Sequence, residues 1–221
     1  MDAPPADELI RELLHNPGKF DEEGRAYILL QHYFAGLSLD TLRPLLRSNN
    51  VLVQQAAGFI ASELGSKASS LIDDVIPLLS STDAYNQWYA MDVLVVSAIG
   101  EKAESFAHLL RMLESETEVI RGQAMVLVAR ADTAQLEASK RVIGRGGSRL
   151  DAHRESLQAL ATAHRLDPNV IAGMMQSSDD VTRRYAAIAA YRVRREHPGL
   201  MAQAATSEDP EIRKFHETMS R

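Results

Sequence analysis

The residues best suited to contact a partner lie in the stretch Asp74–Gly100. Tyr85, Trp88 and Asp92 are spaced at i, i+3 and i+7, which places them on one face of a helix. Tryptophan is over-represented among the residues that anchor binding, and exposed apolar clusters usually mark contact surfaces. The spacing therefore predicts an aromatic and acidic binding surface, which Val95 extends. The alternative is that Trp88 packs in the core between neighbouring helices.

The sequence carries no recognisable catalytic or metal-binding motif. It contains no cysteine, which excludes disulfides, thiolate metal sites and cysteine nucleophiles. Its histidines form no HExxH pair, and none of its serines lies in a GxSxG motif. We therefore predict no catalytic residue, no metal site and no cofactor, and we expect a binding protein rather than an enzyme.

The stretch around Trp88 is one copy of a pattern that recurs about every 32 residues. Short apolar segments end at intervals of 30 to 34 residues, at Leu14, Leu46, Leu79, Leu113, Ile143, Met175 and Ala205. A small residue in each following segment keeps a similar spacing, at Ala26, Ala57, Ala90, Ala124, Ser156 and Ala187. Periods of this length indicate stacked pairs of helices, in which no pair can bury its apolar face alone.

The local chemistry of each copy fits a pair of helices. Turns such as Ser48–Asn50 and Ser81–Asp83 hold short oxygen-bearing side chains, which can accept hydrogen bonds from the N–H groups that open a helix. Gly36, Gly65 and Gly100 suit left-handed caps at helix ends. We therefore predict an all-α protein with a single repeat domain over residues 1–221. The expected pairs lie near 6–36, 38–65, 68–100, 102–131, 134–166, 168–197 and 199–221.

The turn of the fifth pair, Gly144–Ser148, is irregular and rich in glycine. Its backbone could bind an anion between Arg141 and Arg149. It lacks the GxxxxGK[ST] spacing of a phosphate-binding loop and follows no predicted strand. A simple break between helices is the favoured interpretation.

Charge is distributed unevenly along the chain. The net charge is −6, and residues 1–110 carry 7 Lys and Arg against 15 Asp and Glu, whereas residues 111–221 carry 17 against 15. This balance argues against non-specific nucleic-acid binding and would attract a basic partner to the acidic half. The first ten residues do not resemble a secretory signal, and the apolar run Val93–Ile99 is too short to span a bilayer. We expect a soluble, cytoplasmic protein with no membrane partner.

Four stretches resemble the turns and second helices of HEAT-like repeat proteins. They are Ser48–Gly65, Glu116–Ala129, Ser177–Arg192 and Ser207–Lys214. Asp-x-x-Val/Ile-Arg and Ala-Ala patterns are the usual signature of that family. The resemblance covers essentially the whole chain. It implies a right-handed α-solenoid of about seven HEAT-like helical hairpins, whose second helices line the concave surface.

On that implied concave surface, Trp88 would have neighbours in the adjacent repeats. Gln55 and Phe59 occupy the equivalent positions in the repeat before it, and Gly122 and Val126, which could leave a hollow, occupy those in the repeat after it. By register, Arg154 and Arg192 fall on the same side of the array as Trp88. There they could bind an acidic partner or remain solvated. The expected partner-binding residues are Tyr85, Trp88, Asp92, Gln55, Phe59, Arg121, Arg154 and Arg192.

The resemblance leaves three functions open. One is an immunity protein that binds and neutralises a basic toxin domain in its concave groove. Another is a scaffold or regulatory subunit. The third is a DNA-binding protein or DNA glycosylase, because such HEAT-like enzymes hold an alkylated nucleotide with concave Trp, Asp and Arg groups, here Trp88 and Asp92 with Arg121 or Arg130. The acidic first half and the scarcity of lysine argue against nucleic acid, so we expect a non-catalytic, protein-binding array.

Overall fold

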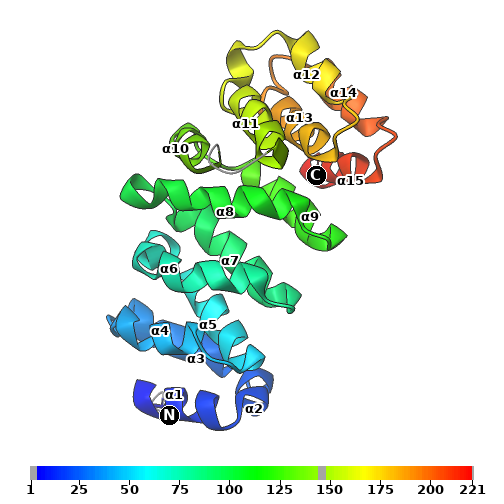
Figure 1. Cartoon of the computed structure of the whole chain (residues 1–221). Coiled ribbons are helices and arrows are strands. Elements are labelled where there is room, and N and C mark those ends of the chain that lie inside the picture. Colours follow the sequence, from blue (N-terminus) through cyan, green and yellow to red (C-terminus); the bar gives the residue numbers. More distant parts are fainter. Residues whose placement is uncertain (1–3, 144–147, 221) are drawn as a thin grey trace. The chain divides into compact units, whose positions relative to one another are not determined.

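The computed structural model describes residues 4–143 and 148–220, and every regular element within these ranges is a helix (Figure 1). The all-α class predicted from the sequence is confirmed. Internal contacts divide the chain into two compact units, Met1–Ile99 and Gly100–Arg221, called the first and second unit below. The prediction of a single repeat domain stays a prediction. Within the described residues, no helix is long and apolar enough to cross a lipid bilayer.

The first unit consists of α-helices and shorter 3-10 helices (η). The α-helices are α1 (Ala6–His15), α2 (Pro17–Glu22), α3 (Arg25–Phe34), α4 (Arg43–Leu46), α5 (Val51–Glu63), α6 (Ile72–Val75) and α7 (Ala84–Ser97). The 3-10 helices are η1 (Leu39–Thr41), η2 (Gly65–Leu71) and η3 (Ile76–Ser80). Pro44 and Pro77 lie in the first turn of α4 and η3, where the N–H that proline lacks is not needed.

The second unit has the same two kinds of element. Its α-helices are α8 (Phe106–Arg111), α9 (Glu118–Val128), α10 (Thr133–Ile143), α11 (Ser148–Ala161), α12 (Pro168–Met174), α13 (Asp180–Arg192), α14 (Pro198–Ala205) and α15 (Pro210–Met219). The 3-10 helices are η4 (Gly100–Ser105), η5 (Met112–Glu114) and η6 (Ala163–Arg165).

The small residues predicted in the second helices lie in the core, as part of a buried stripe of small and apolar side chains. On α5, α7 and α9, and just beyond their last residues, this buried stripe consists of Ala57, Ile60, Ala61, Leu64, Ala90, Val93, Leu94, Ser97, Ala98, Ala124, Leu127, Val128 and Ala131. Gly58 brings α5 and α7 close together, because a Cβ atom added there would lie 3.2 Å from Cβ of Tyr89. The predicted caps at Gly36, Gly65 and Gly100 have φ values of 107°, 58° and 56°.

One turn geometry recurs through both units. A serine hydroxyl accepts a hydrogen bond from the backbone N–H two residues later, over 3.1 to 3.3 Å, at Ser48, Ser81, Ser115, Ser177 and Ser207. In four of these five turns, the later residue is also the N-cap whose side chain accepts from the next helix, at Asn50, Asp83, Asp179 and Asp209. Each such turn is fixed by its own sequence, which explains why the helices start at regular intervals.

The two units pack their helices differently. In the first unit, α3 packs on α5 and α5 packs on α7, so that successive second helices are neighbours. In the second unit, α9 packs against α13 and α15, while α11 packs against α10 and α13 (Figure 1). The helix α9 is therefore joined to α15, which follows it only after five intervening α-helices.

Candidate functional site

The predicted surface on α7 is exposed to solvent. The exposed fraction is 57% for Tyr85 and 38% for Trp88, and Asp92 is half-buried. Val95 is half-buried and Val96 is exposed. Trp88 is thus not a fully buried core residue, and α7 presents two large aromatic side chains beside a carboxylate.

The surface continues across α5 and α3 into a hollow of about 420 Å³. Two of the predicted residues, Gln55 and Phe59, line it together with Tyr85. We call it the aromatic hollow, and its lining residues are Asp21, Gly24, Ala26, Tyr27, Gln55, Ala56, Phe59, Tyr85 and Tyr89. Trp88 and Asp92 lie on α7 next to these residues but are not part of the lining.

Close packing of α5 on α7 holds the rings of the aromatic hollow. Phe59 and Tyr89 meet edge to face with their centroids 6.0 Å apart, and Tyr85 stacks on Tyr89 at 6.5 Å. Tyr27 adds a fourth ring from α3 and is 62% exposed. Gly58 permits this arrangement, since a side chain there would push against Tyr89.

The aromatic hollow lies in a negative electrostatic environment. Asp21, at the end of α2, is the charged residue of the lining. The pKa of the Tyr89 phenol is raised, first by burial and then by the negative charge of Asp21, with smaller effects from Asp92 and Asp83. The same charges favour a cation placed near the rings.

The positive charges of the first unit are largely paired with its own carboxylates. Residues 1–99 carry 6 Lys and Arg against 13 Asp and Glu. Arg25 forms ion pairs with Glu12 at 2.7 Å and Glu23 at 2.6 Å. Arg43 and Arg47 both pair with the buried carboxylate of Asp74, and these pairs leave the unit with a surplus of negative charge.

Sequence reasoning missed six of the nine residues that line the aromatic hollow, among them Tyr27, Tyr89 and Asp21. A signal for the two tyrosines was present, because Tyr27, Phe59 and Tyr89 follow one another at 32 and 30 residues, which is the period of the repeat. Asp21 had no such signal. It reaches the hollow from α2, a helix that the repeat pattern did not predict.

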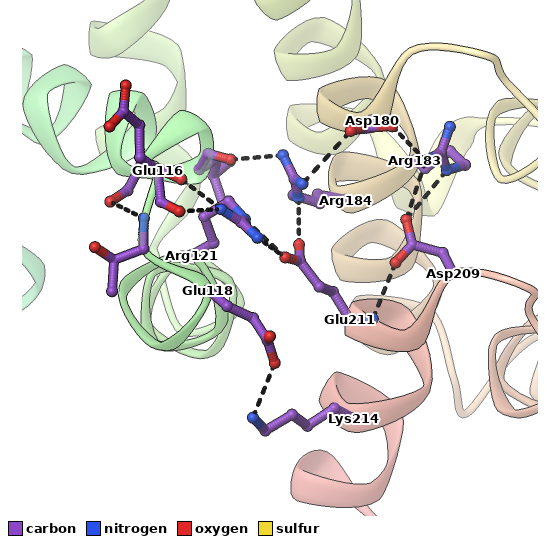
Figure 2. Close-up of polar contacts among 12 residues, drawn as sticks. Glu116, Glu118, Arg121, Asp180, Arg183, Arg184, Asp209, Glu211 and Lys214 are labelled. Atoms are coloured by element: carbon purple, nitrogen blue, oxygen red, sulfur yellow. Dashed lines mark hydrogen bonds and ion pairs between the residues drawn. The ribbon is translucent and has the colours of Figure 1, made fainter.

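The predicted residue Arg121 belongs to an ionic cluster in the second unit, in which Figure 2 shows Glu211 between two arginines. Arg121, on α9, donates to Glu211 Oε1 over 2.7 Å and to the carbonyl of Ser115 over 2.7 Å. Arg184, on α13, donates to Glu211 Oε2 over 2.8 Å and to the carbonyl of Leu113 over 2.9 Å. The cluster thus ties α15 to both α9 and α13.

Further ion pairs extend this cluster along α15. Arg183 pairs with Asp180 and lies 3.2 Å from Asp209, and Lys214 lies 3.2 Å from Glu118 (Figure 2). Hollows of about 790 and 470 Å³ open beside the cluster. The arginines that line both hollows are paired with carboxylates of the same unit, so the cluster acts as an internal link between helices.

The pKa of Glu211 reflects its place in the cluster. Burial disfavours the charged form of this carboxylate, but hydrogen bonds and positive charge from Arg121 and Arg184 outweigh burial, and the pKa of Glu211 is lowered. Only 10% of the Glu211 side chain and 8% of the Arg184 side chain is exposed. Water can therefore solvate neither the Glu211 carboxylate nor the Arg184 guanidinium if its partner is removed.

The other predicted arginines also lie in the second unit. Arg192 is half-buried and donates to the carbonyl of Ala131 over 2.6 Å, and burial lowers its pKa. Arg154 is exposed on α11. Gly122 and Val126 do line a hollow, of about 170 Å³, which α15 borders. The glycine-rich turn Gly144–Ser148 lies outside the described residues, apart from the backbone of its last residue.

A buried histidine provides a second internal contact that the sequence did not indicate. His153 is fully buried, with Nδ1 3.0 Å from the hydroxyl of Tyr185 and Nε2 3.2 Å from Glu114 Oε2. Burial, and then the charge of Glu114, raise the pKa of the Tyr185 phenol. Within the described ranges, no group of three His, Asp or Glu side chains could hold a metal ion.

No protein-family model matches the chain, and no curated protein matches it significantly. The chain is similar to the crystal structure of an engineered protein, with a TM-score of 0.53 and 15% identity over 98% of this chain and 97% of the other. A crystal structure of another engineered protein is 17% identical over 82% of this chain and 94% of the other, with a TM-score of 0.43. The first of these likenesses supports the all-helical fold alone and assigns no function.

Proposed function

We propose that the chain is a non-catalytic protein-binding array that holds a basic partner on the first unit. The observation that carries the proposal is the aromatic hollow with its exposed neighbour Trp88. Aromatic side chains that are open to water, and grouped on three helices, are typical anchors of a protein interface. The excess of carboxylates in residues 1–99 would speed the approach of a basic protein.

The second unit is the less suitable place for the partner. Arg121 and Arg192 donate to carboxylate or carbonyl oxygens of their own unit. Releasing Arg121 for a partner would take one of the two arginines away from Glu211, at a cost of about 1–3 kcal/mol. The engagement of Arg121 removes one of the two arginines named for the glycosylase interpretation, and Arg130, the other, is exposed.

A narrower proposal rests on the resemblance to HEAT-like proteins. In it the chain is a right-handed α-solenoid of about seven HEAT-like hairpins, and it serves as an immunity protein that neutralises a basic toxin domain. The recurring serine turns support a repeated architecture. A scaffold or regulatory subunit would use the same surface, and the identity of the partner distinguishes these roles.

The test is affinity capture from the organism that encodes the chain. Wild type, Trp88→Ala and Val170→Ala are used in parallel, because Val170 is a similarly exposed apolar residue on α12. We expect a basic protein that wild type and Val170→Ala retain and Trp88→Ala loses. Titration calorimetry with the purified partner should show at least about thirtyfold weaker binding for Trp88→Ala, the loss typical of an interface anchor.

Two results would contradict the proposal. One is a partner that binds Trp88→Ala and Tyr85→Ala as tightly as it binds wild type, which would move the interface off the first unit. The other is release of alkylated bases from DNA by wild type and not by Asp92→Asn, which would make the chain an enzyme. Each result is measured on the full chain at low salt, where electrostatic binding is strongest.

A further inference from the structure

We propose that the aromatic hollow receives the guanidinium group of one arginine side chain of the partner. The inference rests on the proposed function and adds the chemical identity of the contact. The evidence lies in the size of the hollow, the kind of groups that line it, and the sign of the charge around it.

The hollow has room for a side chain and not for a secondary-structure element. Its volume is about 420 Å³, near the lower end of the roughly 300–1,000 Å³ that small-ligand pockets occupy. It is open on one side, since Tyr27 and Tyr85 are each more than half exposed. A side chain on an extended segment could enter from that side without any helix moving.

The lining offers the two kinds of contact that a guanidinium needs. The rings of Tyr27, Phe59 and Tyr85 provide faces on which its flat, weakly hydrated cation can stack. Asp21 provides a carboxylate, which can accept two parallel hydrogen bonds from the guanidinium. The Gln55 side chain offers a further amide oxygen. Lysine is less suited, because its ammonium is more strongly hydrated and cannot stack.

The surrounding charge selects a cation and excludes an anion. The pKa of the Tyr89 phenol is raised first by burial, and the negative charges of Asp21, Asp92 and Asp83 raise it further. Three of the unit's arginines, Arg25, Arg43 and Arg47, are paired with carboxylates elsewhere. An uncharged peptide segment could pack on the aromatic rings, but it would leave the negative potential of the hollow uncompensated.

The experiment is an NMR titration of the full chain with labelled tyrosine rings. The probes are acetyl-arginine methylamide, the lysine analogue, and the citrulline analogue, which has nearly the same shape without the charge. We expect shifts at Tyr27, Tyr85 and Tyr89, and none at Tyr33 and Tyr185, which are buried elsewhere. The arginine probe should bind at least about fivefold tighter than the citrulline probe, as one cation–π contact implies.

Two variants distinguish the effect of the Asp21 carboxylate from that of the negative charge of the first unit as a whole. Asp21→Asn should weaken the arginine probe about three- to tenfold, the value of one ion pair in a partly open site. Glu22→Gln is the matched control, because Glu22 is its exposed neighbour outside the lining, and it should change binding less than about twofold. Equal binding of arginine and citrulline probes, or tighter binding of lysine, would overturn the inference.

The outcomes also distinguish this inference from the proposed function. If the arginine probe fails while Trp88→Ala still loses the captured partner, the protein-binding surface stands and the arginine contact is wrong. If the probe binds but the captured partner is indifferent to both Trp88→Ala and Asp21→Asn, the hollow binds arginine and the proposed interface lies elsewhere.

Discussion

The two units use the same turn for different purposes. In turns of both units, the residue six positions after the turn serine donates back to the serine's carbonyl oxygen. In the first unit this residue is Gln87, and in the second unit it is Arg121, Arg183 or Arg213, with donor–acceptor distances of 2.5 to 2.8 Å. A glutamine amide has two N–H donors, whereas a guanidinium has five in a rigid fork. Arg121 and Arg183 therefore close their turns and still reach Glu211 or Asp209 at α15.

This difference decides which surface is open to a partner. Where arginine occupies the position, the surface is crossed by ion pairs to a distant helix, and hollows of about 790 and 470 Å³ are bordered by charges that already have partners. Where glutamine occupies it, the surface beside α7 keeps its aromatic side chains exposed. The two units thus differ at this position in whether the side chain also forms an ion pair with a distant helix.

The largest expected effect comes from removing the centre of the ionic cluster. Glu211→Ala leaves Arg184, which is 7% exposed, with only the more distant carboxylate of Asp180, 3.9 Å away. We expect the free energy of unfolding to fall by about 3–5 kcal/mol, the usual cost of orphaning a buried charge. Urea unfolding followed by circular dichroism measures it. Lys214→Ala is the control, because its exposed ion pair should contribute less than about 1 kcal/mol.

A second prediction concerns acid stability. The folded-state pKa of Glu211 lies below its ordinary value of 4.5, so the unfolded chain binds more protons in that range. The stabilisation is therefore complete above pH 4.5 and is lost as the pH falls through the lower, folded-state pKa. We expect Glu211→Gln to be less stable than wild type at neutral pH and to lose less stability on acidification. Parallel stability curves for the two proteins between about pH 6 and about pH 3 would contradict this.

A third prediction exchanges the residue that distinguishes the units. Arg121→Gln places the first-unit side chain in the second unit, where it can still reach the Ser115 carbonyl but not Glu211. Since Arg184 remains with Glu211, the expected loss is about 1–3 kcal/mol, as for a hydrogen bond to a charged group. Thermal unfolding measures it, and a loss as large as that of Glu211→Ala would mean that the two arginines are not independent supports.

The reverse exchange should have the smallest effect. Gln87→Arg keeps the donor to the Ser81 carbonyl and adds a partly exposed cation to α7. We expect the free energy of unfolding to change by less than about 0.5 kcal/mol, which is typical of surface substitutions. Its effect on partner binding should be a loss, because the added positive charge opposes a basic protein. A gain in affinity would show that the partner is not basic.

The repeat could be predicted because its causes are local. The serine at each turn, the capping residue two positions later and the small residue inside the helix are all close in sequence, and the structure contains each of them at Ser81, Asp83 and Ala90. The exposure of Tyr85 and Trp88 agrees with the same helical spacing, which had left a core position for Trp88 open. Helical periodicity fixes which face a side chain lies on once the buried stripe is known.

The ionic cluster could not be predicted because its partners are distant in sequence. Arg121 and Glu211 are 90 residues apart, and nothing in the period of the repeat indicates that α9 meets α15 rather than α11. The prediction of Arg121 as a partner-binding residue assumed simple stacking of neighbours. Asp21 was missed for a related reason, since α2 lies outside the repeat pattern.

The separation between Arg121 and Glu211 has a consequence for synthesis on the ribosome. At about 5–20 residues per second, Glu211 is added roughly 5–18 s after Arg121. Until then α15, the helix that packs on α9, has not been synthesised. Arg184 therefore lacks its ion pair with Glu211. The first unit meets no such delay, because only one short α-helix lies between α3 and α5 and between α5 and α7. The chain would therefore complete the aromatic hollow before it completes the unit that is held together by ion pairs.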